Sequence, residues 1–179
     1  MDEVIDLDRY TAEERIVDFD KAQLQAILYF LPFAILFGGS YFLLWSGQFS
    51  KPYLKPIFRN PENWLWAVGS FFVGLIIHEL IHGLSWSLFA KKGLRSMTFG
   101  ILWKQLMPYC HCKEPLKVKH YIFGTLMPGI LLGIVPSIVA ILNGDFGLFA
   151  FGFFFTYAAG GDFMIVNLLR KDAMEDWVL

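Results

Sequence analysis

Four long apolar runs constrain the fold of this chain more than any other feature of its sequence. They cover residues 23–45, 64–90, 121–142 and 146–169, and each is long enough to cross a bilayer core of about 30 Å as a helix. Charged residues make up only 17% of the 179 residues, whereas a soluble domain has about 25%. The sequence therefore predicts an all-α polytopic membrane protein with about four transmembrane helices.

The rest of the chain is expected to form polar ends of one membrane domain. Residues 1–20 are rich in Asp and Glu, whereas a cleavable signal peptide begins with a short basic region. We interpret 1–20 as a polar segment outside the bilayer, 21–171 as a single membrane domain and 172–179 as a tail. The net charge of −1 does not point to nucleic acid, so the lipid bilayer is the expected surrounding.

Lysine and arginine residues indicate the orientation, because cytoplasmic connections carry an excess of them. The connection between the third and fourth runs has none, and the fourth run ends in Arg170 and Lys171. The long loop after the second run is strongly basic: Lys91, Lys92, Arg95, Lys104, Lys113, Lys117 and Lys119. The loop after the first run fits less well, with Lys51, Lys55 and Arg59. The balance predicts that both termini are cytoplasmic.

Residues 96–103 of the basic loop mix β-branched and aromatic residues, and residues 107–112 follow after a short polar break. They are compatible with a small β-hairpin on the cytoplasmic face, between the second and third helices. Because the alternation is weak, an irregular amphipathic loop fits equally well.

The third run contains two prolines, Pro128 and Pro136, among the glycines Gly124, Gly129 and Gly133. A helix kinked by proline could open a wet cavity beside a site. Close packing of helices through small residues is the alternative, and we favour it.

The segment His78-Glu79-Leu80-Ile81-His82 carries the clearest chemistry. His78 and His82 are one helical turn apart, so both imidazoles project from one face and can bind a zinc ion. Glu79 could take a proton from a zinc-bound water and pass it to a leaving amine. Ionisable groups are costly in hydrocarbon, and a metal offsets that cost. A polar cluster without metal, hydrogen-bonded between helices, is the alternative.

A catalytic zinc ion needs a third protein ligand, and Asp162 is the one carboxylate within the fourth run. His78 lies about 14 residues past Trp64, and Asp162 about 16 past Phe146, so at 1.5 Å per residue their depths agree within about 3 Å. The glycines at 160–161 should let the carboxylate approach. Alternatively, Asp162 pairs with some other group.

Other polar residues are weaker candidates. Three potential ligands lie together in the basic loop: Cys110, His111 and Cys112. His111 could join the site or assist the transition state if the loop folds back, but we interpret the three as reduced thiols and an interfacial histidine. His120 is expected to mark the interface, and Thr156 and Asn167 either orient a ligand or bond between helices.

The segment 78–83 (HELIHG) in a membrane helix, followed by Gly161-Asp162 in a later one, resembles the site-2 protease class of intramembrane metalloproteases. With CKEPL at 112–116, the chain is similar to a bacterial family of small proteins called putative zincin peptidases, over roughly residues 65–170. The later motif of site-2 proteases is Leu-Asp-Gly, whereas here Gly161 precedes Asp162 and Phe163 follows.

This resemblance implies His78, His82 and Asp162 as zinc ligands, Glu79 as general base, and a bacterial cell membrane as the location. The leading hypothesis is a zinc-dependent, membrane-embedded endopeptidase that cleaves membrane proteins or peptides. Its substrate must unwind, and an exposed strand within 96–112 could capture the unwound segment by edge pairing. The alternatives are a non-enzymatic membrane zinc-binding protein and a structural subunit.

Overall fold

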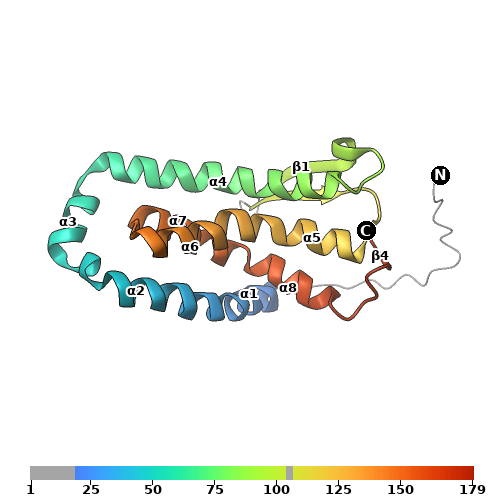
Figure 1. The fold of residues 1–179 in the computed structure, drawn as a ribbon. Helices are drawn as coiled ribbons and strands as arrows, with labels where there is room; N and C mark the ends of the chain where they lie inside the picture. The colour runs from blue at the N-terminus through green and yellow to red at the C-terminus, as the bar shows by residue number, and fades with distance from the viewer. Residues whose placement is uncertain (1–18, 104–106) are drawn as a thin grey trace, which may run out of the picture.

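The protein is an elongated bundle of helices with a short hairpin along one side (Figure 1). A computed structural model describes residues 19–103 and 107–179. Four described helices are long and apolar enough to cross a membrane: Gln23–Phe49, Pro61–Ser87, Val118–Asn143 and Phe146–Leu169. The prediction of an all-α polytopic membrane protein is confirmed. The expected polar segment over 1–20 falls almost wholly outside the described residues.

The first span is interrupted near Pro32, and a second, shorter helix follows it. After Pro32 the helix passes through a π-helical segment, because a proline removes one hydrogen bond of the α-helical ladder. The order of elements is α1 (Phe19–Phe33), the π-helical segment Ala34–Gly38, α2 (Gly39–Trp45), the 3₁₀ turn Ser46–Phe49 and α3 (Lys51–Arg59). The helix α3 was not predicted; it connects the first span to the second at the end of the bundle opposite the hairpin.

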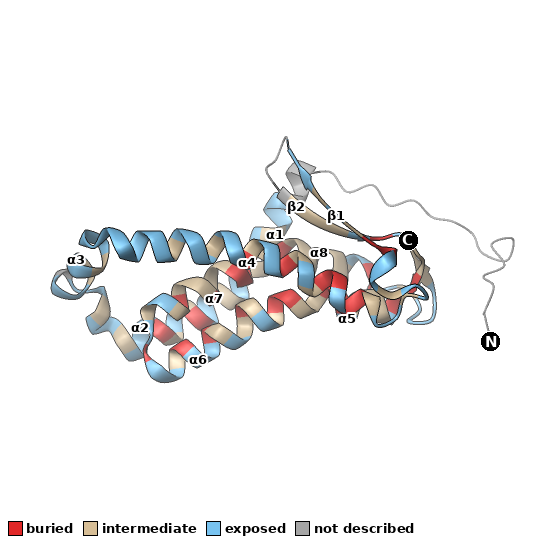
Figure 2. Ribbon diagram, turned by 90° about the horizontal axis from the view of Figure 1, so that it is seen from above, coloured by how far each residue is buried: buried red, intermediate tan, exposed pale blue. Residues whose placement is uncertain are grey.

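The second span is α4 (Pro61–Ser87), which begins where the Asn60 side chain accepts a hydrogen bond from the N–H of Glu62. Its buried residues all lie in its second half, and its first half is largely exposed (Figure 2). Those buried positions are Gly74, His78, His82, Gly83, Ser85 and Trp86. The part of α4 that packs inside the bundle is therefore its second half, which carries the paired histidines.

The third and fourth spans form a tight helical hairpin. Gly144 forms the turn with φ of +75°, a left-handed conformation that favours glycine, and Asp145 caps the next helix by accepting from the N–H of Leu148. The elements are α5 (Val118–Pro128), the π-helical segment Gly129–Ile134, α6 (Val135–Asn143), α7 (Phe146–Ala158) and α8 (Gly160–Leu169).

These two spans pack closely through glycine. A Cβ at Gly133 would lie 2.7 Å from the backbone nitrogen of Thr156, and one at Gly152 would lie 2.6 Å from that of Ser137. Such distances leave no room for a side chain. The structure thus favours close packing as the role of the glycines in the third span.

The β-hairpin is confirmed, with β1 (Met97–Leu102) antiparallel to β2 (Met107–Cys112). It runs back beside α4, with the Phe99 ring packed on Gly83 and Ile101 sharing a groove with Ile76 (Figure 2). The sequence indicated only a hairpin between the second and third helices, whereas the structure packs its strands against the second half of α4.

The C-terminal tail is not free. Its strand β4 (Trp177–Val178) pairs with β3 (Leu116–Lys117), directly before α5. Glu175 forms ion pairs with Lys117 and Lys119, and hydrogen bonds from these two ammonium groups lower the pKa of Glu175 to about 2. The tail thereby ties the end of the fourth span to the start of the third.

At the end of the bundle near α3, a set of polar and aromatic side chains, here called the joint, holds the first span against the turn between α6 and α7. The joint consists of Tyr41, Trp45, Gln48 and Gly144. Tyr41 Oη and Gln48 Nε2 both donate to the carbonyl oxygen of Gly144, at 3.1 and 2.7 Å, and Trp45 Nε1 donates to that of Ile141 at 2.9 Å. The single Tyr41 hydroxyl proton is shared between the Gly144 carbonyl and Gln48 Oε1, which lies 2.6 Å from Tyr41 Oη.

Candidate metal centre

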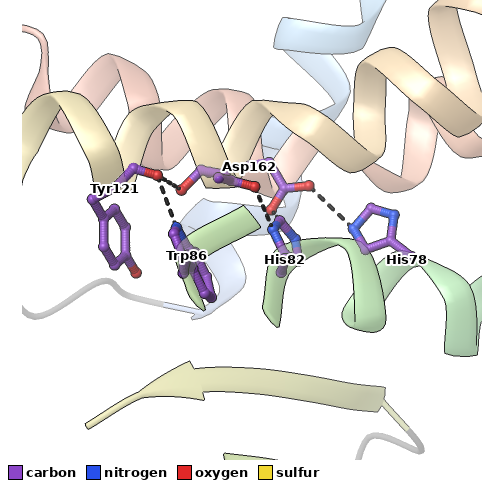
Figure 3. A network of polar contacts seen from close by, with 7 residues as sticks. His78, His82, Trp86, Tyr121 and Asp162 are labelled. Carbon is purple, nitrogen blue, oxygen red and sulfur yellow. Dashed lines mark hydrogen bonds and ion pairs between the residues drawn. The ribbon is translucent and has the colours of Figure 1, made fainter. Parts of the chain in front are cut away.

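His78, His82 and Asp162 meet between α4 and α8 (Figure 3). His78 Nε2 lies 3.2 Å from Asp162 Oδ2, and His82 Nε2 lies 3.3 Å from Asp162 Oδ1. The two imidazole side chains are only 8% and 6% exposed, and the carboxylate 14%. The structure therefore brings together, inside the membrane domain, the three residues that the sequence selected as ligands.

Two helices position these side chains. On α4, one helical turn separates the histidines, and their ring centroids are 4.9 Å apart. The fourth span breaks at Ala159, so Asp162 lies in the first turn of a new helix, α8. A carboxylate in a first turn is favoured by the exposed N–H groups and the helix dipole.

The reason expected for the approach of Asp162 was wrong. A Cβ at Gly160 would meet the carbonyl oxygen of Ala26 on α1 at 2.6 Å, and a Cβ at Gly161 would have open space. Neither glycine lies at the contact between α8 and α4, so neither explains how Asp162 approaches the histidines. Instead α4 approaches the fourth span at Gly74, where a Cβ would lie 2.3 Å from the ring of Phe155.

The three side chains differ in how their polar atoms are satisfied. His82 Nδ1 lies 3.0 Å from the carbonyl oxygen of Gly124 on α5. In contrast, His78 Nδ1 is buried and has no hydrogen-bond partner among the described residues, and Asp162 Oδ2 has no hydrogen bond there beyond its ion-pair contact of 3.2 Å with His78 Nε2. Buried polar atoms usually have a hydrogen-bond partner, so the Asp162 oxygen that faces the histidines points to a missing ligand.

The donor set fits a zinc ion. One ligand atom from each residue, two imidazole nitrogens and one carboxylate oxygen, lie within 4.8 Å of one another. Catalytic zinc sites use three protein ligands of these types and keep a fourth position open. Within the described part of the chain, this is the group of His, Cys, Asp and Glu side chains that could hold a metal ion.

Glu79 does not belong to this cluster but lies on the adjacent face of α4, toward the hairpin. It lines a groove of about 300 Å³ between α4 and the hairpin, whose other walls are apolar or aromatic. The lining residues are Ile76, Leu80, Phe99, Gly100, Ile101, Pro108 and Tyr109. A carboxylate therefore stands at one side of an apolar groove, one residue from a candidate ligand.

The hairpin approaches Glu79 through β2. The backbone N–H of Cys110 faces the Glu79 carboxylate, and the Cys110 thiol packs where a Cβ of Gly83 would lie, 3.2 Å from Sγ. Burial raises the pKa of this thiol to about 12, and the nearby charges of Glu79 and Cys112 add to the effect. A thiol in such surroundings stays protonated at neutral pH.

The other sequence candidates lie apart from the centre. Cys112 Sγ donates to the carbonyl of Glu114 at 3.3 Å, and His111 is exposed. His120 stacks on Phe89, with centroids 4.0 Å apart, in accord with an interfacial position. The remaining two are on the fourth span: Thr156 bonds the carbonyl of Gly152 in its own helix, and Asn167 is half-buried further along α8.

Two groups at the centre were not anticipated, the carbonyl of Gly124 and the indole of Trp86. The Trp86 ring stacks on His82 with centroids 5.0 Å apart and planes within 13°. Its Nε1 donates to the carbonyl of Tyr121 at 3.0 Å (Figure 3). The available signal was the spacing, since Trp86 follows His82 by one helical turn.

Comparison with known proteins gives one finding. A family model with the description "Putative zincin peptidase" matches residues 71–175, more than half of the chain. Neither curated proteins nor solved structures give a match. The matched segment contains both histidines, Glu79 and Asp162.

Proposed function

Because the chain belongs to the putative zincin peptidase family, whose chemistry implies zinc, we propose that it is a membrane-embedded zinc endopeptidase. Its zinc ligands would be His78, His82 and Asp162. The observation that carries the proposal is the convergence of these three buried side chains from two spanning helices, where the two Asp162 oxygens face the two histidine Nε2 atoms and Oδ2 has no hydrogen bond among the described residues. A divalent cation would offset the cost of burying them.

The chain's own residues supply the proton transfer. When bound, zinc acts as a Lewis acid that polarises a peptide carbonyl and acidifies water. Glu79 then accepts a proton from the attacking water and donates it to the leaving amine. Its place on the helical face next to the histidines, at the wall of the groove, allows it to reach both the metal side and the substrate side.

We propose that the substrate is an unwound segment of a membrane protein or peptide, aligned along the outer edge of β2. The N–H of Lys113 donates to the carbonyl of Ser96, which fixes the alternation of the ladder. In that alternation the N–H and C=O of Cys110 point away from β1, and this N–H faces Glu79. An added strand at this edge would lie beside the proposed base.

The groove supports an apolar substrate. Apart from Glu79 its walls are hydrophobic or aromatic, and Pro108 presents no N–H there that would need a partner. Large apolar side chains next to the scissile bond are therefore expected. The four apolar spans make the protein an integral membrane protein. We further propose cytoplasmic termini, because the hairpin end of the bundle is the more basic, and a bacterial cell membrane, which rests on the family resemblance alone.

The test compares three forms of the full chain in liposomes: wild type, Glu79→Gln and Glu62→Gln. The last removes a carboxylate from the exposed start of the same helix. Each is incubated with a proteome-derived peptide library, cleavage is read by mass spectrometry, and zinc by elemental analysis. We expect Glu79→Gln to keep its zinc while its cleavage rate falls about 10³-fold, since general acid–base catalysis accelerates a reaction by about 10²–10⁴-fold. Undiminished cleavage by Glu79→Gln would exclude Glu79 as the base.

A further inference from the structure

The carbonyl oxygen of Gly124 lacks its usual donor in α5. In an α-helix this carbonyl would accept the N–H of the residue four positions later, and that residue is Pro128, which has none. Pro128 is fully buried and lies at the last position of α5. Its presence therefore leaves a free acceptor inside the bundle, directed at α4.

His82 provides the donor for this acceptor. Its Nδ1 lies 3.0 Å from the Gly124 oxygen, and both groups are buried. A carbonyl can only accept, so the proton of the neutral imidazole is on Nδ1 and the lone pair on Nε2. That Nε2 is the atom 3.3 Å from Asp162, on the side of the metal centre.

The plane of the His82 ring is held by a second contact with α5. Trp86 stacks on the ring and is itself bonded to the carbonyl of Tyr121, three residues before Gly124. A Cβ at Gly124 would lie 2.1 Å from Cδ1 of Trp86, so only glycine lets the indole pack here. Thus α5 holds Trp86 and His82 through two carbonyls that are about one helical turn apart, those of Tyr121 and Gly124.

We propose that Pro128 is a positioning residue for the metal centre: by lacking an N–H, it frees the Gly124 carbonyl to fix the tautomer and orientation of His82. This rests on the proposed function in so far as His82 is a zinc ligand. His78 has no such support, because its Nδ1 has no partner among the described residues. The two ligands are therefore unequal, and His82 is the pre-oriented one.

The test restores the missing N–H. Pro128→Ala and Pro128→Val both supply it, and the valine also keeps most of the buried volume. Pro136→Ala is the matched control, because it makes the same change eight residues further along the same span. Zinc affinity of the purified full chain is measured by competition with a chelator. Nitrogen-15 NMR of histidine-labelled protein follows the Nδ1–H of His82, one of only four histidines.

We expect zinc affinity to fall about 10- to 100-fold in both Pro128 variants, the usual effect of losing a partner of a ligating histidine. The slowly exchanging Nδ1–H of His82 should weaken in both, and Pro136→Ala should match wild type. Wild-type affinity and an unchanged Nδ1–H in both variants would overturn the inference. So would an effect in Pro128→Ala alone, which would indicate lost volume, or an equal effect in Pro136→Ala.

Failure of the proposed function gives a different result. If the wild-type chain bound no zinc, the metal centre itself would be wrong, whereas the Nδ1–H of His82 would still report the hydrogen bond to Gly124. If wild type bound zinc and the Pro128 variants bound it equally well, only the positioning role would be lost.

Discussion

The metal centre lies within the half of the bundle that carries the hairpin, the joint lies at the α3 end, and both are held in the same way. At both, side chains of one span donate hydrogen bonds to backbone carbonyls of another. Trp45 and Trp86 make equivalent contacts, since each donates a hydrogen bond from its indole nitrogen to a backbone carbonyl of the third span. The two regions differ in what remains unbonded.

At the joint, the polar side-chain atoms of Tyr41, Trp45 and Gln48 all have partners. At the metal centre, His78 Nδ1 has none among the described residues, and Asp162 Oδ2 has only its ion-pair contact of 3.2 Å with His78 Nε2. Unbonded polar groups are costly in a membrane, so a closed network stabilises a fold while an open one is suited to a ligand. The comparison predicts that changes at the joint alter stability and changes at the centre alter zinc binding.

The largest expected effect is loss of zinc from Asp162→Ala. Removal of one of three protein ligands should weaken zinc binding by more than about 100-fold, beyond the effect of losing a mere partner of a ligand. Chelator competition on the purified chain measures it. A normal zinc affinity would break the comparison.

The next effect is at the joint, where Gly144→Ala should destabilise the fold by about 2 kcal/mol. A left-handed backbone conformation costs a non-glycine residue about 1–2 kcal/mol, and here the new Cβ would also lie 2.8 Å from the Trp45 ring. Unfolding titrations in mixed micelles provide the measurement, and zinc affinity should stay at the wild-type value. Gly39→Ala, where a Cβ meets nothing within 4 Å, is the control.

A milder change at the same place is Tyr41→Phe. The ring and its stacking on Phe149, at 4.0 Å between centroids, are kept, while the hydrogen bonds of the hydroxyl are lost. We expect stability to fall by about 1 kcal/mol, the usual net value of a buried hydrogen bond. Groups that support a ligand change zinc affinity by about 10- to 100-fold when they are removed. A change of more than about twofold in Tyr41→Phe would therefore show that the joint and the metal centre are coupled.

The smallest effect concerns the tail, which lies at the hairpin end of the bundle, beyond the half that holds the metal centre. The pKa of Glu175 is lowered from 4.5 to about 2, so its ion pairs stabilise the tail fully above pH 4.5 and lose this effect as pH falls toward 2. The protection factors for hydrogen exchange at the amides of Val118 and Lys119, which bond to the tail, should therefore fall in acid, after correction for the intrinsic pH dependence of exchange. Glu175→Gln should remove this acid dependence. The amide of Gly144 at the joint should not respond, and an equal response there would contradict the assignment to Glu175.

The spans and the paired histidines could be predicted from the sequence because each rests on local spacing. Apolar length identifies a span, and a separation of four residues places His78 and His82 on one face. The depth estimate for Asp162 worked for the same reason, since both spans enter from one side and rise equally per residue.

The remaining features depend on contacts between distant segments. Nothing near Gly160 shows that it packs on Ala26, and the pairing of β4 with β3 joins residues about sixty positions apart. The partner of His82 is a backbone carbonyl, which no residue type marks. The one sequence feature that could have indicated this carbonyl is Pro128, four residues after Gly124. Membrane helices commonly contain prolines that support no ligand, so Pro128 alone was not a specific signal.

X-ray absorption at the zinc edge of the purified, zinc-loaded chain tests the central claim most directly. The account predicts one zinc ion per chain with two imidazole nitrogens at about 2.0–2.1 Å, oxygen at about 2.0–2.2 Å and no sulfur. Sulfur at about 2.3 Å would place the ion on the thiols of the hairpin. That result, or the absence of bound zinc, would contradict a centre built from His78, His82 and Asp162.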